Sequence, residues 1–155
     1  MAKFIVQGGK PLKGEVLISG SKNAALPILC ASMLTKEKVI LKNVPNIADI
    51  HTMIKILRAF GAKIKFQNNE MEISARNLKS NGIPNDVIKK MRASILILGG
   101  LLPRLGELKI AFPEDACSEK DPYTRTLTRF KNLGVKLWTI KTGFTLNAKN
   151  FTAGK

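Results

Sequence analysis

The sequence predicts an α/β protein built from two βαβαββ-type repeats, in which solvent-facing sheets surround buried helices. Three observations lead to this class. The order helix, strand, helix, strand, strand occurs twice along the 155 residues. The expected strands alternate polar and apolar residues, which is typical of sheets with one face in water. One expected helix in each repeat is apolar on nearly all sides, and such a helix belongs inside a protein.

The chain is expected to open with two short strands, over residues 3–7 and 13–19. The second strand runs into Gly20, which permits a sharp turn that a β-carbon would obstruct. An apolar helix is expected over residues 24–34. Strand, glycine turn and buried helix therefore follow one another directly at the start of the first repeat.

A lysine lies where this helix begins. Ser21 or Asn23 is expected to cap the helix, and Pro27 to fall in its first turn, where a missing N–H does little harm. Lys22 is then held beside free backbone N–H groups, and ammonium, amides and helix dipole all favour an anion. The alternative is a solvated lysine in a turn.

The rest of the first repeat follows the same kind of pattern. Residues 39–41 are expected to form a strand, and Asn46 with Asp49 resembles a capping box before an amphipathic helix. Gly61 is expected to end that helix as its C′ residue. Residues 63–66 and 71–74 alternate with period two around Asn68-Asn69 and predict a hairpin.

The second repeat has the same order of elements. Residues 86–102 are expected to form the apolar helix and residues 108–112 a strand. A second amphipathic helix is expected to start at Asp121-Pro122, because proline is favoured at the first helical position. This helix is expected to end at Gly134. The expected closing hairpin pairs residues 135–138 with residues 144–146.

Composition excludes several classes of protein. Two cysteines do not make a disulfide framework, and no spacing of metal ligands is present, so neither a metal nor a cofactor is expected. There is no signal-peptide pattern and no apolar run long enough to span a bilayer, which favours the cytoplasm and no membrane partner. The net charge of +15 comes mostly from scattered lysines, so any binding of nucleic acid is expected to be non-specific.

Several stretches resemble one enzyme family. They are Lys3-Phe4-Ile5-Val6-Gln7-Gly8-Gly9, Ile18-Ser19-Gly20-Ser21-Lys22-Asn23-Ala24-Ala25, Asn43-Val44-Pro45 and Met91-Arg92-Ala93-Ser94. Together they resemble the N-terminal portion of the UDP-N-acetylglucosamine enolpyruvyl transferases (1-carboxyvinyltransferases), relatives of EPSP synthase. The resemblance is strong to about residue 112 and ragged beyond it. It implies an inverted α/β fold, with subdomains arranged around a bundle of buried helices.

The resemblance also implies a domain organisation. N-terminal strands over residues 1–20 are expected to precede a first subdomain at 21–84 and a second at 85–155. Enzymes of this family carry three such subdomains in each of two lobes, with the active site between the lobes. The chain is therefore expected to be a fragment, a split gene product or a degenerate relative, and a complementary chain could supply the missing repeats.

The family reaction transfers enolpyruvate from phosphoenolpyruvate to UDP-N-acetylglucosamine, in the synthesis of peptidoglycan precursors for the cell wall. The resemblance assigns substrate binding to Lys22, Asn23, Arg92 and Pro122. Cations are needed to hold phosphate and carboxylate, and an arginine can do so with two parallel hydrogen bonds. By the same resemblance the catalytic cysteine of a mobile loop corresponds to Cys117, although Cys117 lies one place beyond the family position.

This loop departs from the family pattern in charge. Counted without gaps, Ala116 occupies the cysteine position, and Asp121 replaces the arginine that precedes Pro122. Carboxylates around Cys117 disfavour its thiolate, so we expect slow alkylation there. The expected function is enolpyruvyl transfer, with the chain alone inactive. The alternatives are a catalytically inactive UDP-sugar-binding or assembly subunit, and a basic nucleic-acid-binding module.

Overall fold

The computed structural model describes residues 3–80, 96–111, 122–140 and 143–148. Within the first half, the elements are α1 (Lys22–Ala31), the short helix η1 (Ser32–Leu34), β1 (Lys38–Leu41), α2 (Ala48–Ala59), β2 (Lys63–Gln67) and β3 (Glu70–Ser74). The second half contains α4 (Leu96–Leu105), β4 (Glu107–Ala111), α5 (Pro122–Asn132), β5 (Lys136–Ile140) and β6 (Gly143–Asn147). The described elements thus follow the order that the repeat predicted.

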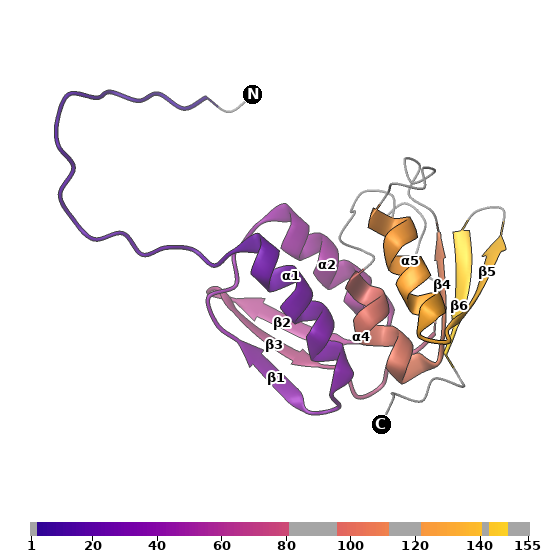
Figure 1. Ribbon diagram of the computed structural model, residues 1–155. Helices are drawn as coiled ribbons and strands as arrows, with labels where there is room; N and C mark the ends of the chain where they lie inside the picture. Colours follow the sequence, from indigo (N-terminus) through magenta and orange to yellow (C-terminus); the bar gives the residue numbers. More distant parts are fainter. Residues whose placement is uncertain (1–2, 81–95, 112–121, 141–142, 149–155) are drawn as a thin grey trace.

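The two sheets have the same topology. In each, the last strand of the repeat lies in the centre, giving the orders β1-β3-β2 and β4-β6-β5 with all pairs antiparallel. The helices lie between the two sheets (Figure 1). Met71 and Ile73 of β3 are buried, whereas Lys63 and Lys65 of β2 are exposed. The prediction of solvent-facing sheets around buried helices is confirmed.

Single asparagine and glycine residues mark the ends of several helices and strands. Asn68 and Asn69 have φ values of 50° and 58°, as the two central residues of a tight hairpin turn require. Gly61 follows α2 with φ 92°, and Gly134 follows α5 with φ 83°. Both glycines occupy the left-handed conformation that ends many helices. Asparagine and glycine adopt this conformation at low cost, which is why these signals could be recognised in the sequence.

The two halves share one hydrophobic core. Helix α4 packs against α1 and η1, and its buried Ile97 and Leu101 join Leu29 and Met33 in that core. Gly100 of α4 faces the backbone of α1, where an added β-carbon would overlap the carbonyl oxygen of Cys30. The helices therefore approach each other more closely than any larger residue at this position would allow.

The predicted strands at residues 3–7 and 13–19 are not formed. Residues 3–20 have no regular secondary structure, and the part before Gly20 runs away from the folded part as an extended arm (Figure 1). Leu12 and Leu17 on this arm are each 99% exposed. A strand needs a partner for its backbone groups, and neither described sheet pairs with the arm. Alternation in the sequence indicates a strand only where such a partner is present.

The predicted place of Pro27 was also wrong. Helix α1 begins at Lys22, so Pro27 lies in its interior and not in its first turn. A proline there cannot donate to the carbonyl group of Asn23, four residues earlier. The helix tolerates this because Leu26, Leu29 and Cys30 are buried on its other side and hold it in place.

Arg104 links the second half to the first. Its Nη1 atom donates to the backbone oxygens of Met33 at 2.8 Å and Thr35 at 2.9 Å. We expect Arg104→Met, which keeps most of the apolar stem, to lower the free energy of unfolding by about 1–3 kcal/mol, as for other hydrogen bonds from charged groups. Urea unfolding measures this. Arg125→Met, on the exposed surface of α5, is the matched control and should change stability little.

Candidate anion site at the start of helix α1

Lys22 is the first residue of α1, as the sequence predicted for a residue beside free N–H groups. Ser21 is the N-cap residue in an extended conformation, but its side chain makes no capping hydrogen bond. The backbone N–H groups of the first turn thus have no side-chain cap from Ser21. Asn23 is exposed next to Lys22. A cation and uncapped amides at one helix end can bind an anion.

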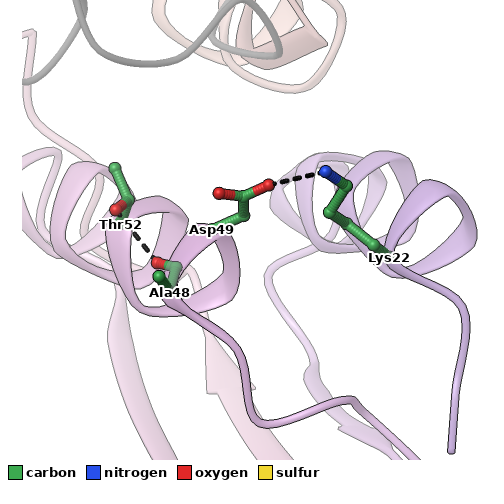
Figure 2. Close-up of polar contacts among 4 residues, drawn as sticks. All are labelled: Lys22, Ala48, Asp49 and Thr52. Carbon is green, nitrogen blue, oxygen red and sulfur yellow. Dashed lines mark hydrogen bonds and ion pairs between the residues drawn. The ribbon is translucent and has the colours of Figure 1, made fainter. Parts of the chain in front are cut away.

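The lysine is paired with a residue from another helix. Lys22 Nζ lies 2.9 Å from Oδ2 of Asp49, the second residue of α2 (Figure 2). Beside Asp49, Thr52 Oγ1 donates to the carbonyl oxygen of Ala48 at 3.0 Å. The first turns of α1 and α2 are therefore joined by an ion pair. Sequence reasoning assigned Asp49 to a capping box and missed this pair.

The predicted capping box is wrong. The N-cap residue of α2 is Ile47, which has no side-chain capping bond. The Oδ1 atom of Asn46 instead lies 2.7 Å from Nε2 of His51, whose ring packs edge-on against Phe66 at 5.8 Å. The pattern failed because Asn46 contacts His51 and Asp49 pairs with Lys22 instead. A lysine at a helix start, with no acid in its own first turn, was the signal that could have indicated an external carboxylate.

Gly20 fixes how the chain reaches the site. Its backbone runs so close to the turn after β1 that an added β-carbon would overlap the carbonyl oxygen of Asn43 and lie 3.2 Å from Cδ of Pro45. The φ angle of Gly20 is not in the left-handed region, so close approach, and not turn geometry, requires the glycine. The sequence predicted a sharp turn at Gly20, but no turn is formed at this residue, and the glycine is required by the close approach instead.

Two hollows lie on the surface of the first half. One, of about 290 Å³, lies between the start of α1 and β1 and is lined mainly by apolar atoms, with Ala24, Ile28, Ile40 and Lys42 among its residues. The other, of about 350 Å³, lies at the β2–β3 hairpin and includes Glu70 and Glu72. Its lining has two carboxylates and a single cation, Lys65, which makes the second hollow a poor place for an anion.

Most other predicted site residues lie outside the described residues. Arg92 and Cys117 belong to that part of the chain, as do Ala116 and Asp121. Pro122 is the first residue of α5, as predicted, and nothing is described of its side chain. The structure therefore places Lys22 and Asn23 together, while the roles of Arg92, Cys117 and Pro122 stay predictions.

Cys30 lies in the core, on the buried side of α1. Burial raises the pKa of its thiol to about 12. We expect Cys30 to resist alkylation at pH 8 and to react only when the chain unfolds. Because the folded pKa exceeds the unfolded value, this thiol stabilises the fold below pH 9 and loses that contribution as the pH rises toward 12. Alkylation at increasing urea, read by mass spectrometry, measures the protection, and rapid labelling without urea would contradict it.

Within the described ranges, no cluster of three or more histidine, cysteine, aspartate or glutamate side chains could hold a metal ion. In that same part of the chain, none of the helices has both the length and the apolar character to cross a membrane.

The family model for EPSP synthase (3-phosphoshikimate 1-carboxyvinyltransferase) matches residues 6–154. The chain belongs to the EPSP synthase family. The UDP-N-acetylglucosamine 1-carboxyvinyltransferase of Thermotoga maritima is 44% identical over 137 residues, covering 88% of this chain and 32% of the relative. The protein of the same name from Endomicrobium trichonymphae is 41% identical over 155 residues, covering 99% of this chain and 37% of the relative. The chain thus spans about a third of each relative.

Solved structures confirm the fold. The enolpyruvyl transferase NikO from Streptomyces tendae superposes with a TM-score of 0.76 at 23% identity, covering 94% of this chain and 32% of that one. EPSP synthase from Acinetobacter baumannii gives a TM-score of 0.55 at 16% identity, covering 81% of this chain and 31% of that one. At these identities the likeness establishes the fold alone. The inverted α/β fold that the sequence predicted is therefore the fold of this chain.

Proposed function

We propose that this chain supplies the phosphoenolpyruvate-binding part of a transferase that moves enolpyruvate to UDP-N-acetylglucosamine, in peptidoglycan precursor synthesis. The observation that carries the proposal is Lys22, a cation at the uncapped start of α1 in a member of the EPSP synthase family. The relatives named as UDP-N-acetylglucosamine 1-carboxyvinyltransferases support the choice of acceptor. Arg92 and Pro122 are proposed as further substrate contacts, on the family resemblance.

The reaction depends mainly on cations and hydrogen-bond donors placed around the phosphate. The oxygen of a sugar hydroxyl adds to the carbon that carries the phosphate, while a base takes the hydroxyl proton and an acid protonates the methylene carbon. Loss of phosphate together with a proton from the resulting methyl group then restores the double bond. A lysine ammonium with helix N–H groups stabilises the phosphate as it gains negative charge. In this proposal Lys22 has this binding role, and Asn23 beside it donates a further hydrogen bond from its amide.

We expect the purified chain to bind phosphoenolpyruvate through Lys22. Titration with phosphoenolpyruvate, followed by the amide NMR signals of the first turn of α1, measures the affinity. Lys22→Ala should weaken binding about tenfold or more, as expected for the loss of a charged contact. Lys38→Ala is the matched control, because Lys38 is also half-exposed and paired with a carboxylate, Glu72, at 2.9 Å. Equal losses in the two variants would contradict the assignment.

A second candidate is a catalytically inactive relative that still binds a UDP-sugar or assembles with another subunit. Asp121 and Ala116 favour it, because they replace a cation and a thiol in the loop that the resemblance identifies. Only the first candidate requires phosphoenolpyruvate binding, so the titration described above separates the two, and neither candidate requires activity of the chain alone. We expect the chain alone to release no phosphate from phosphoenolpyruvate and UDP-N-acetylglucosamine above a Lys22→Ala background. Release above that background would exclude the inactive relative.

A further inference from the structure

Lys22 occupies a position that helix electrostatics disfavour. The positive end of the helix dipole lies at the first turn, where anions stabilise and cations destabilise. Helix α1 has no acidic residue in its first turn to offset this cost. Asp49, by contrast, lies in the first turn of α2, where a carboxylate is favoured. The stabilising carboxylate for α1 therefore comes from the neighbouring helix.

Helices α1 and α2, which carry Lys22 and Asp49, are held by buried, well-packed side chains. On α1, Leu26, Leu29 and Cys30 are buried, and on α2 so are Ile50 and Met53. The Sγ atom of Cys30 lies 3.9 Å from Sδ of Met53, where the helices meet. Since these helices cannot shift without disturbing the core, the carboxylate of Asp49 is presented from a rigid support.

The ion pair constrains Lys22 without using all of its donors. A lysine side chain has several rotatable bonds, and an unpaired ammonium samples many positions before an anion binds. An ammonium has three N–H donors, and the contact with Asp49 Oδ2 at 2.9 Å needs only one. As Figure 2 shows, the lysine side chain extends from the start of α1 toward α2. Two donors remain for a substrate anion.

We propose that Asp49 is a positioning residue for Lys22 and holds its ammonium at the joined starts of α1 and α2. This inference rests on the proposed function, in which Lys22 binds phosphoenolpyruvate. The pair is half-exposed, with side-chain exposures of 50% for Lys22 and 42% for Asp49, and exposed pairs of this kind contribute little to stability. Its value lies in orienting the cation before the substrate arrives.

Simple electrostatics and the positioning role predict opposite effects of Asp49→Asn on the affinity for phosphoenolpyruvate. Asp49→Asn removes a negative charge close to an anion site, which by Coulomb attraction alone should tighten phosphoenolpyruvate binding. If Asp49 positions Lys22, the same change should weaken binding about five- to tenfold. Asp49→Glu, which keeps the charge at a slightly different reach, should restore part of the affinity.

The chain contains a matched control for this test. Glu72 pairs with Lys38 at 2.9 Å, with side-chain exposures of 39% for Glu72 and 56% for Lys38. Glu72→Gln changes the net charge by the same amount, at a pair between strands β1 and β3. We expect it to leave the affinity for phosphoenolpyruvate unchanged within twofold. Thermal unfolding of each variant establishes that the fold is kept.

A double-mutant cycle separates positioning from a structural role. In the Lys22→Ala background, Asp49→Asn should no longer weaken phosphoenolpyruvate binding, because the residue it positions is gone. Equal weakening in both backgrounds, or unchanged or tighter binding in Asp49→Asn alone, would overturn the positioning role. If wild-type chain fails to bind phosphoenolpyruvate, or Lys22→Ala binds as wild type does, the proposed function fails first and this inference with it.

Discussion

Alanine at Gly100 is expected to destabilise the fold, while alanine at the preceding Gly99 is expected to stabilise it. A β-carbon at Gly100 would overlap the carbonyl oxygen of Cys30 and crowd the β-carbon of Met33 at 3.4 Å. Backbone atoms cannot move aside as a flexible side chain can, so α1 and α4 must separate. Overpacking of this kind costs about 1–3 kcal/mol, and we expect the upper end of that range.

Gly99 is the matched control in the same helix. Nothing lies within 4 Å of an added β-carbon there, and the residue is exposed. Alanine then adds only helix propensity, and stability should rise by up to about 1 kcal/mol. Urea unfolding followed by circular dichroism measures both variants. A Gly100→Ala chain as stable as wild type would show that α1 and α4 do not pack this closely in solution.

The chain is expected to associate with itself through one face of the first helix. Five apolar residues recur along that side of α1 and η1 and are exposed in the structure, namely Ala24, Pro27, Ile28, Ala31 and Leu34. Ile28 and Leu34 are 49% and 50% exposed. A continuous apolar face of this kind normally binds another protein surface, and here we expect a second copy of the chain.

Sedimentation at increasing protein concentration measures this association. Ile28→Lys should shift the chain toward monomer, because a charge in the middle of the face opposes burial. Leu133→Lys is the control: Leu133 is also apolar and 61% exposed, but it follows α5, and the substitution adds the same charge. Monomeric wild-type chain at all concentrations, or equal effects of the two variants, would contradict the expectation.

The sequence was sufficient to predict local structure wherever a single residue type determines the backbone conformation. Asparagines at positive φ formed the β2–β3 hairpin, glycines ended α2 and α5, and Pro122 began α5. The repeat fixed the order of elements, and the resemblance identified the family that the family model matches. Each of these signals acts over a few residues or repeats along the chain, so the sequence determined them without knowledge of the packing.

What only the tertiary structure decided depends on partners distant in sequence. The strand pattern of residues 3–19 formed no strand, because a strand requires a neighbour and neither described sheet supplies one. The close contact of Gly100 with Cys30, and the bonds from Arg104 to Met33 and Thr35, join residues about 70 positions apart. Asp49 had a suitable local role as a capping residue, yet its carboxylate pairs with Lys22. The partner of a side chain depends on what the fold brings within reach, and neighbours along the chain do not determine which partner that is.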